Sequence, residues 1–496
     1  MTLGQTTENK QPVMTDIKKV EKYMEDRVGI GTSFDIGYRE LIVLKTKVDL
    51  YYVTGLCDTS VIQEILKKLI EINDVESNRR KLPEIIENRL VHQQIEHVKT
   101  MDEAVDQVLS GLVAVFVDGY REAIIIDVRQ YPGRTPEEPD TERVVRGSRD
   151  GYTENIIENT ALTRRRLRDT RLRHEMLKVG ERSKMDVCLS YVKDIADPDL
   201  IDVIRKKLEE IEIDGVSMAD KAIEEFLVPQ RWNQYPLVRY TERPDVVSNH
   251  LLEGHVIMFV DTSPSAVIFP TTFFHHLQHA EEYRQTPTVG TFIRLTRFLG
   301  VFASMYLLSF WLLVSTDQTL LPKELSFIGP EEEGNVPIVI QIILAEIGIE
   351  FLRMAAIHTP TPLSTALGLI AAVLIGQIAI DVGLFSPAVI LYVAVSSVGS
   401  YVTPSYELSI ANKLFSILLV IATALFGLSG FVVGIVVHIL LLARLRSLET
   451  PYLWPFIPFN AKAMLHIVFR IPTPYSNTRP SIVHPANNYR QPVKKS

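Results

Sequence analysis

Hydrophobic and charged residues are distributed differently on the two sides of Arg297. Before it, short apolar runs alternate with charged residues, whereas charges become rare from Phe298 to Leu445. The run at 298–316 carries no charge and is long enough to cross a bilayer, which takes about 20 apolar residues in a helix. Further apolar runs follow at about 336–357, 365–382, 384–402 and 413–446. The pattern predicts an α-helical polytopic membrane domain over 298–446, with four to six helical segments.

The last apolar run, at 413–446, is too long for one straight crossing. The stretch Gly-Leu-Ser-Gly at 427–430 lies in its middle, and glycine permits a break in a helix. Lys413 at one end and Arg444 and Arg446 at the other are all basic, and basic residues favour the cytoplasmic side of a membrane. We therefore expect a helical hairpin whose two ends lie on the same side.

Basic residues also orient the first apolar run. Arg294 and Arg297 precede it, and three glutamates at 331–333 follow it, which fits a cytosolic start and an outer loop. The first residues of the chain are polar and contain no apolar signal-peptide core. We expect an even number of crossings, with the N-terminus and a C-terminal tail at 447–496 both in the cytosol.

The charged region before the membrane domain contains an internal repeat. Residues 50–69 align without gaps with 189–208, and residues 109–126 align with 252–269 at nearly the same offset. The first pair has the pattern of a strand, an acidic N-cap and an amphipathic helix, and the second that of a glycine-capped helix end and a hairpin. The repeat predicts an α/β region of two similar subdomains, at 33–131 and 185–275. The remaining stretches are expected to be a flexible N-terminal segment (1–32), a charged connector (132–184) and an interfacial segment (276–297).

Composition and motifs exclude several classes of function. The net charge of −8 argues against a nucleic-acid binder. Cys57 and Cys188 lie in separate segments, so neither a disulfide framework nor a metal knuckle is expected. The sequence has no phosphate-binding loop, dinucleotide fingerprint, nucleophile elbow or zinc-protease motif. We therefore expect neither enzymatic activity nor a cofactor.

One segment has the spacing of a metal site. His275, His279 and Glu282 lie at i, i+4 and i+7, which on a helix would let nitrogen and carboxylate ligands hold zinc. The segment directly precedes the first apolar run, however. An interfacial helix with aromatic and polar faces explains it better, and we expect no metal.

A basic stretch at 161–180 is a candidate interaction segment. Basic helices bind phospholipid headgroups or nucleic acid, but the acidic run at 137–142 can neutralise this one. A structural or intersubunit role is favoured over a membrane-surface role, and nucleic acid is the least favoured partner. The arginines concerned are Arg164, Arg165, Arg166, Arg168, Arg171 and Arg173.

Ionisable residues inside the apolar region are candidate pore residues. Glu346, Glu350 and Arg353 lie at i, i+4 and i+7, on one face of a helix, and Asp381 lies at the boundary of two later runs. Glu350 and Arg353 can pair, which leaves Glu346 without a partner on its own helix. The face is either a buried ion-pair cluster that fixes helix register or the polar lining of an ion or solute path. On the second interpretation Glu346 is the better pore candidate.

Several stretches resemble the GerA family, the A-type subunits of spore germinant receptors. They lie at 136–196, 240–274, 320–325, 375–380 and 448–458, and the similarity extends over about 33–460. Residues 28–59 are most similar to the branch of the family that is encoded with dipicolinate-release proteins. The usual family motif RGPRE is present here as RGSRD at 146–150. The signature residues are Arg146, Gly147, Arg164, Arg165, Arg166, Arg243, Pro244 and Asp245.

The resemblance implies an integral membrane subunit of a spore germination complex in the spore inner membrane. It implies a homo-oligomer that works with other germination membrane proteins in the lipid bilayer and forms or amplifies a channel for ion release. The alternative is a non-conducting scaffold or nutrient-receptor subunit that positions partner proteins.

Overall fold

The computed structural model describes residues 11–75, 82–89, 95–131, 142–322, 336–358 and 372–490, together with the single residues 324, 328 and 368. The chain divides into two compact units, which are considered separately below. The α/β unit comprises Met1–Gln230, Val238–Pro270 and Pro472–Ser496. The helical unit comprises Arg231–Leu237 and Thr271–Ile471.

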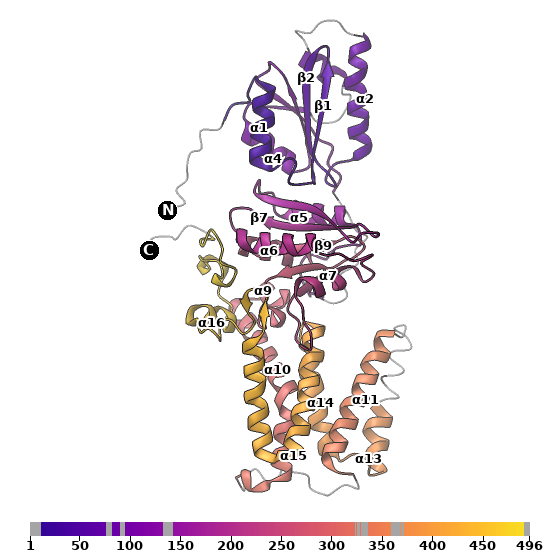
Figure 1. Cartoon of the computed structure of the whole chain (residues 1–496), viewed down its shortest axis with the longest axis vertical. Coiled ribbons are helices and arrows are strands. Elements are labelled where there is room, and N and C mark those ends of the chain that lie inside the picture. Colours follow the sequence, from indigo (N-terminus) through magenta and orange to yellow (C-terminus); the bar gives the residue numbers. More distant parts are fainter. Residues whose placement is uncertain are drawn as a thin grey trace. The chain divides into compact units, whose positions relative to one another are not determined.

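The α/β unit contains two antiparallel five-stranded sheets with equivalent strand orders (Figure 1). The first sheet has the order β1-β2-β4-β5-β3 and the second has the order β6-β7-β9-β10-β8. Each strand of the first sheet therefore has a counterpart five strands later in the chain. The expectation of two subdomains of similar plan is confirmed in this strand order.

The two copies also share their helices. In each copy the described elements follow the order helix, two strands, two helices, strand, helix and two strands. The first copy consists of α1 (Ile17–Val28), β1 (Ile36–Val43), β2 (Thr46–Val53), α2 (Thr59–Val75), α3 (Leu82–Arg89), β3 (Ile95–Val98), α4 (Met101–Leu109), β4 (Val113–Val117) and β5 (Ala123–Ile126). The second consists of α5 (Ile156–Arg166), β6 (Leu172–Val179), β7 (Met185–Val192), α6 (Pro198–Glu209), α7 (Ala219–Leu227), β8 (Arg239–Thr241), α8 (Pro244–Glu253), β9 (Val256–Val260) and β10 (Ala266–Phe269).

The N-terminal part of each copy differs from the sequence-based expectation. Residues 17–28, within the segment expected to be flexible, form α1, and its Val20, Met24 and Val28 are buried. The connector expected at 132–184 likewise contains α5 and β6. Both expectations were therefore wrong for these stretches. The apolar residues of α1 form only a narrow stripe among charged residues, so that the charge conceals a helix that packs on a sheet.

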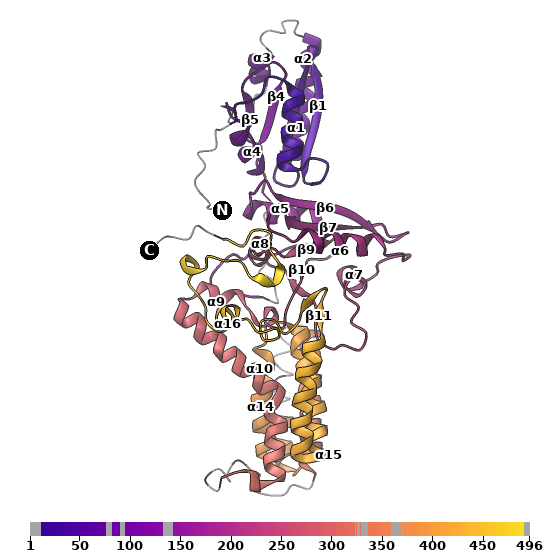
Figure 2. The ribbon, with the colours of Figure 1, turned by 60° about the vertical axis from the view of Figure 1, so that its left-hand side comes forward.

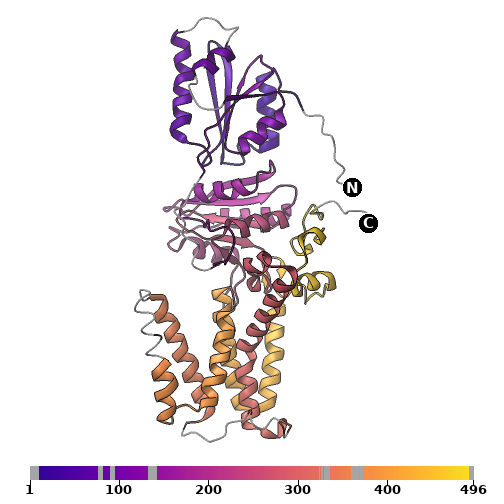
Figure 3. The same ribbon diagram turned by 180° about the vertical axis from the view of Figure 1, so that it is seen from behind.

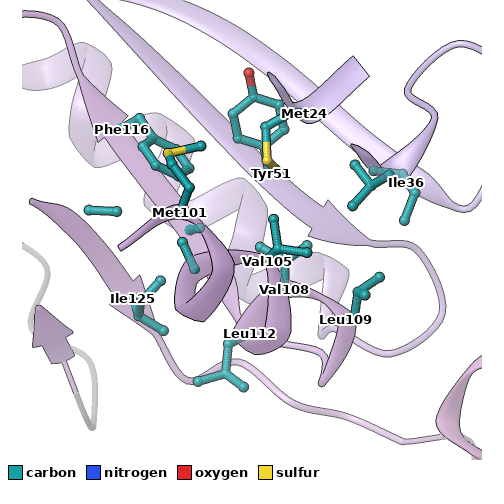
Figure 4. Close-up of a cluster of buried hydrophobic side chains, with 14 of the residues drawn as sticks. Met24, Ile36, Tyr51, Met101, Val105, Val108, Leu109, Leu112, Phe116 and Ile125 are labelled. Atoms are coloured by element: carbon teal, nitrogen blue, oxygen red, sulfur yellow. The ribbon is translucent and has the colours of Figure 1, made fainter. Parts of the chain in front are cut away.

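Helices cover both faces of the first sheet. Along β4, Val113, Val115 and Val117 pack toward α2 and α3, whereas Ala114 and Phe116 pack toward α1 and α4. This alternation follows from the two-residue period of a strand. Figure 4 shows the second of these cores, in which Met24, Tyr51 and Phe116 gather around the helix that carries Met101 and Val105.

The helical unit is built around a bundle whose members share one apolar core. Leu308, Ile342, Val389 and Val420, from α10, α11, α14 and α15, belong to a single buried cluster. Figures 1 and 3 both show α11 beside α14, and Figure 2 shows α10 and α15 side by side. The bundle elements are α10 (Pro287–Thr316), α11 (Ile338–His358), a π-helical stretch (Ala372–Ile378) continued by α13 (Ala379–Asp381), α14 (Pro387–Tyr401) and α15 (Tyr406–Arg444). The smaller elements of the unit are α9 (Ala280–Arg284), β11 (Arg446–Ser447), β12 (Thr450–Pro451) and α16 (Ala461–Val468).

The surface of this bundle is apolar. α10 and α15 are long and apolar enough to cross a membrane, and α14 is a shorter apolar helix. Large side chains on them remain exposed, with exposed fractions of 71% for Leu299, 71% for Leu425 and 67% for Phe426. Contiguous apolar surface is characteristic of a face that lipid or a partner protein covers.

The helix α15 is a hairpin of two arms, at 406–426 and 428–444, as expected from the glycines at 427–430. Gly427 has φ 59° and ψ −138°, which side-chain-bearing residues rarely adopt. The ring of Phe415 stacks on that of His438 with 3.7 Å between centroids. Gly430 packs so tightly on the other arm that a Cβ atom there would come within 2.1 Å of the carbonyl oxygen of Ala422. These contacts pair residues in antiparallel order about Gly427, and the predicted hairpin is confirmed.

We expect Gly427→Ala to destabilise the helical unit, because alanine is strained at this backbone conformation by about 1–3 kcal/mol. The measurement is the midpoint of thermal unfolding of the purified chain in detergent micelles. Gly376→Ala is the matched control, since Gly376 also has open space around it but lacks the positive φ of Gly427. Equal midpoints for the two variants would contradict a strained reversal at Gly427.

Candidate functional site

The charged residues of α11 meet a lysine from α15. The Nζ atom of Lys413 lies 3.0 Å from Oε2 of Glu346 and 3.0 Å from Oε2 of Glu350. Lys413 and Glu346 are almost completely buried, with side-chain exposures of 8% and 4%. One ammonium group therefore bridges two carboxylates that lie one helical turn apart.

Arg353 completes this cluster. Its Nε atom lies 3.7 Å from Oε2 of Glu350, and its Nη2 donates a hydrogen bond of 3.0 Å to Oγ of Ser400 on α14. The guanidinium carbon lies 4.8 Å from the centre of the Tyr401 ring, a cation–π distance. We call Glu346, Glu350, Arg353 and Lys413 the charge cluster. It contains two acids and two bases and holds α11 against α14 and α15.

Glu346 has no ion-pair partner on its own helix, as expected, but it has one on another helix. Its partner is Lys413, which as a basic residue at the end of an apolar run was assigned only to the membrane boundary. The pairing of Glu350 with Arg353 is confirmed, at the looser distance of 3.7 Å. Glu346 is buried, Glu350 and Arg353 are partly exposed, and all three form ion pairs within a single chain, as the ion-pair interpretation requires.

Asp381 is separate from the charge cluster. It is exposed at the end of α13, and no ion pair joins it to another described residue. Together with Gln377, which is also exposed, it lines an open hollow of about 380 Å³ whose other lining residues are Val373, Gly376 and Ile380. A carboxylate on an otherwise apolar segment is thus directed to the outside of the single chain.

The side chains of His275, His279 and Glu282 do not come together as a metal site. The segment is not one helix, because a 3₁₀ turn at His275–Leu277 ends before α9 begins at Ala280. The buried carboxylate of Glu282 is paired with Arg297 and lies 2.7 Å from Nε of Arg294. Nδ1 of His279 instead accepts a hydrogen bond from the backbone N–H of Glu281. The expected interfacial helix is therefore wrong for 275–279.

The signature residues Arg243, Pro244 and Asp245 hold a loop of the second copy in the α/β unit. The buried guanidinium of Arg243 donates hydrogen bonds to the carbonyl oxygens of Glu142 and Ser148, at 3.0 and 3.1 Å. Asp245 accepts from the same guanidinium at 3.1 and 3.0 Å, and Pro244 occupies the first turn of α8. These three residues therefore fix the stretch that precedes α5.

The arginines of α5 make internal contacts. Arg164 is buried and pairs at 2.8 Å with Asp35, which precedes β1 of the first copy. Burial alone would raise the pKa of Asp35, but the Arg164 guanidinium holds that pKa below its usual value. Arg166 pairs with Asp150 at 2.6 Å. These contacts support the structural role that was favoured for the basic stretch.

The remaining signature residues lie nearer the surface. The guanidinium of Arg165 lies over the ring of Tyr131, 4.5 Å from its centre. Arg146 and Gly147 are exposed in the loop held by Arg243, and Gly147 has a φ of 146°.

His438 is a polar residue in the apolar second arm of α15, and it was not among the expected site residues. Its Nε2 lies 2.7 Å from the hydroxyl of Tyr235 and its Nδ1 lies 2.9 Å from the hydroxyl of Tyr306. It therefore joins the segment 231–237 to α10. A single histidine within a long apolar run is the signal that would have drawn attention to it.

Comparisons with known proteins agree with the resemblance. The family model described as Bacillus/Clostridium GerA spore germination protein matches residues 22–482. Stage V sporulation protein AF of Bacillus subtilis (strain 168) is 58% identical over 486 residues, which cover 98% of this chain and 99% of that protein. Spore germination protein KA of the same organism is 29% identical over 490 residues, covering 98% of this chain and 90% of that protein.

A crystal structure of the N-terminal domain of the A subunit of the Bacillus megaterium spore germinant receptor GerK3 matches 53% of this chain and 98% of its own chain. The match has 25% sequence identity and a TM-score of 0.42. The family model matches nearly the whole chain, and the sporulation protein is 58% identical to it. These two findings show the family. The chain belongs to the Bacillus/Clostridium GerA family of spore germination proteins.

Proposed function

We propose that this chain is a membrane-embedded subunit of a spore germination complex in which copies of the chain supply part of a path for ions. The family membership supports the setting, and the apolar surface of α10, α14 and α15 supports the membrane. The observation that carries the ion path is the exposed carboxylate of Asp381 beside the exposed amide of Gln377.

Asp381 suits this role better than Glu346. The charge cluster has as many bases as acids and lies inside one chain, so it offers no unbalanced charge to an ion. Asp381 has an exposed carboxylate and no described ion-pair partner. A ring of carboxylates, one from each copy, would favour cations at the mouth of a path.

Assembly of several copies would also remove the free-energy cost of exposing the Asp381 carboxylate to lipid. A carboxylate that faces lipid costs about 2.5–3.5 kcal/mol on insertion scales, less near the interface. In a homo-oligomer the same face would meet water or another copy instead. Among the described residues between 287 and 444, six helical segments follow one another when the two arms of α15 are counted separately and the short 3₁₀ turn at Gln318–Leu320 is left out. An even number would leave both termini on one side, which the basic residues indicate is the cytosol.

A non-conducting scaffold is the alternative function. The charge cluster favours it, because a neutral, buried set of charges fixes the arrangement of helices without offering a site to an ion. Other germination membrane proteins would then be the partners that the chain positions.

We expect Asp381→Asn to lower the selectivity for cations over anions several-fold while the complex still assembles. The change removes one negative charge per copy and keeps the shape of the side chain. The measurement is ion flux through the purified complex in liposomes, with assembly checked by size-exclusion chromatography.

Glu407→Gln is the matched control, since Glu407 is another exposed acid of the helical unit. It should leave selectivity unchanged. If Asp381→Asn behaves like this control, Asp381 does not line the path. If the wild-type complex passes no ions, the scaffold function is the correct one.

A second prediction concerns the charge cluster. Lys413→Met should destabilise the chain by about 3–5 kcal/mol, because it leaves the buried carboxylate of Glu346 without its partner. Combining it with Glu346→Gln should recover part of the loss, since the double variant removes both charges. The measurement is a double-mutant cycle on thermal stability in detergent. Additive losses would show that the two side chains do not interact.

A further inference from the structure

Three side chains with metal-binding groups meet at the end of α8, in the α/β unit. Nitrogen atoms of His250 and His255 and a carboxylate oxygen of Glu253 all lie within 4.8 Å of one another. Gly254, with a φ of 109°, reverses the chain, and the backbone N–H of His255 bonds back to the carbonyl of His250 at 3.0 Å. The reversal brings the two imidazole rings to 5.0 Å between centroids.

The hydrogen bond of His250 leaves one ring nitrogen suited to a metal. Its Nδ1 lies 2.9 Å from the backbone carbonyl of Val246, which can only accept a hydrogen. Nδ1 therefore carries the hydrogen, and Nε2 keeps its lone pair. Metal-binding histidines commonly have this arrangement, in which the second nitrogen donates to a carbonyl and fixes the tautomer.

The carboxylate of Glu253 is oriented by the C-terminal segment. Its Oε1 accepts a hydrogen bond of 2.8 Å from Arg490, and the side chain retains 23% exposure. Metal-binding carboxylates are commonly held by such an outer hydrogen bond, which leaves the second oxygen for the metal.

The fold itself does not require these residues. In the internal repeat His250, Glu253 and His255 align with Gln107, Ser110 and Leu112 of the first copy. There Gly111 makes the equivalent reversal with a φ of 93°, and the apolar Leu112 is buried where the second copy has His255. The same turn thus forms without any metal-binding side chain, so the reversal alone does not account for the three polar groups of the second copy.

We propose that His250, Glu253 and His255 form a binding site for a transition-metal dication such as Zn²⁺, with water completing the coordination. Two imidazoles and one carboxylate are a ligand set of open zinc sites. Ligand atoms around zinc lie about 3.3–3.5 Å apart, given its bonds of about 2.0–2.2 Å, so the side chains need to close by at most about 1.5 Å. Arg239 and Arg490 oppose a cation here, and affinity depends on nitrogen coordination, which excludes Mg²⁺ and Ca²⁺.

The test is titration of the full chain, in detergent micelles and without a histidine tag, with Co²⁺ as a spectroscopic probe and Zn²⁺ as competitor. We expect one equivalent of Co²⁺ with the visible absorption of a tetrahedral site, displaced by Zn²⁺ but not by Mg²⁺ or Ca²⁺. His255→Leu and His250→Gln introduce the residues of the first copy, so both should fold. Each should weaken Co²⁺ binding at least tenfold.

His466→Gln is the control, because His466 lies in the helical unit and outside the site. It should bind Co²⁺ like the wild type. Circular dichroism and the thermal midpoint verify that each variant is folded, and Glu253→Gln supplies a third variant that keeps side-chain shape. The proposal is overturned if the wild type takes up no Co²⁺ at saturation, or if folded His250, Glu253 and His255 variants all bind as tightly as the control.

Discussion

A charge that leaves water must meet an opposite charge, and each unit of this chain is organised around such pairs. In the α/β unit Arg164 and Asp35 are both about 1% exposed, and their ion pair connects the two copies of the repeat. In the helical unit Lys413 plays the corresponding part for Glu346. Because removal of one partner strands the other in an apolar setting, these pairs restrict the arrangements in which the helices can pack. They contribute to specificity more than to net stability.

The elements that were predictable from sequence are those whose pattern is local. The reversal in α15 follows from an apolar run too long for one crossing and from glycines at its centre. The duplication follows from two ungapped alignments, and the equivalent strand orders agree with it. The helix α1 escaped prediction because only Ile17, Val20, Met24 and Val28 mark its buried face among many charges. Its burial depends on a sheet that the helix sequence does not contain.

The charge cluster shows the same limit at the level of side chains. Helical periodicity places Glu346, Glu350 and Arg353 on one face, and α11 does present them together. Helical periodicity contains no information about Lys413, which is 63 residues from Glu350 and lies on another helix. Without that lysine, Glu346 looks like an unpaired acid and hence like a pore residue. A tertiary ion pair can thus favour a structural role for a residue that the spacing along its own helix leaves unpaired.

The two copies of the fold can be compared position by position, which shows which side chains the shared backbone needs. Both copies make a glycine reversal after a helix and bury the residue that follows it, Leu112 in one and His255 in the other. Leucine there is explained by the core alone, whereas a buried imidazole loses hydration that its contacts must replace. The signature residues Arg243 and Asp245 also lie in the second copy, where they hold the loop before α5. The two copies therefore share the glycine reversal but differ in the polar groups around it, and the first copy shows that the reversal forms without His250, Glu253 and His255.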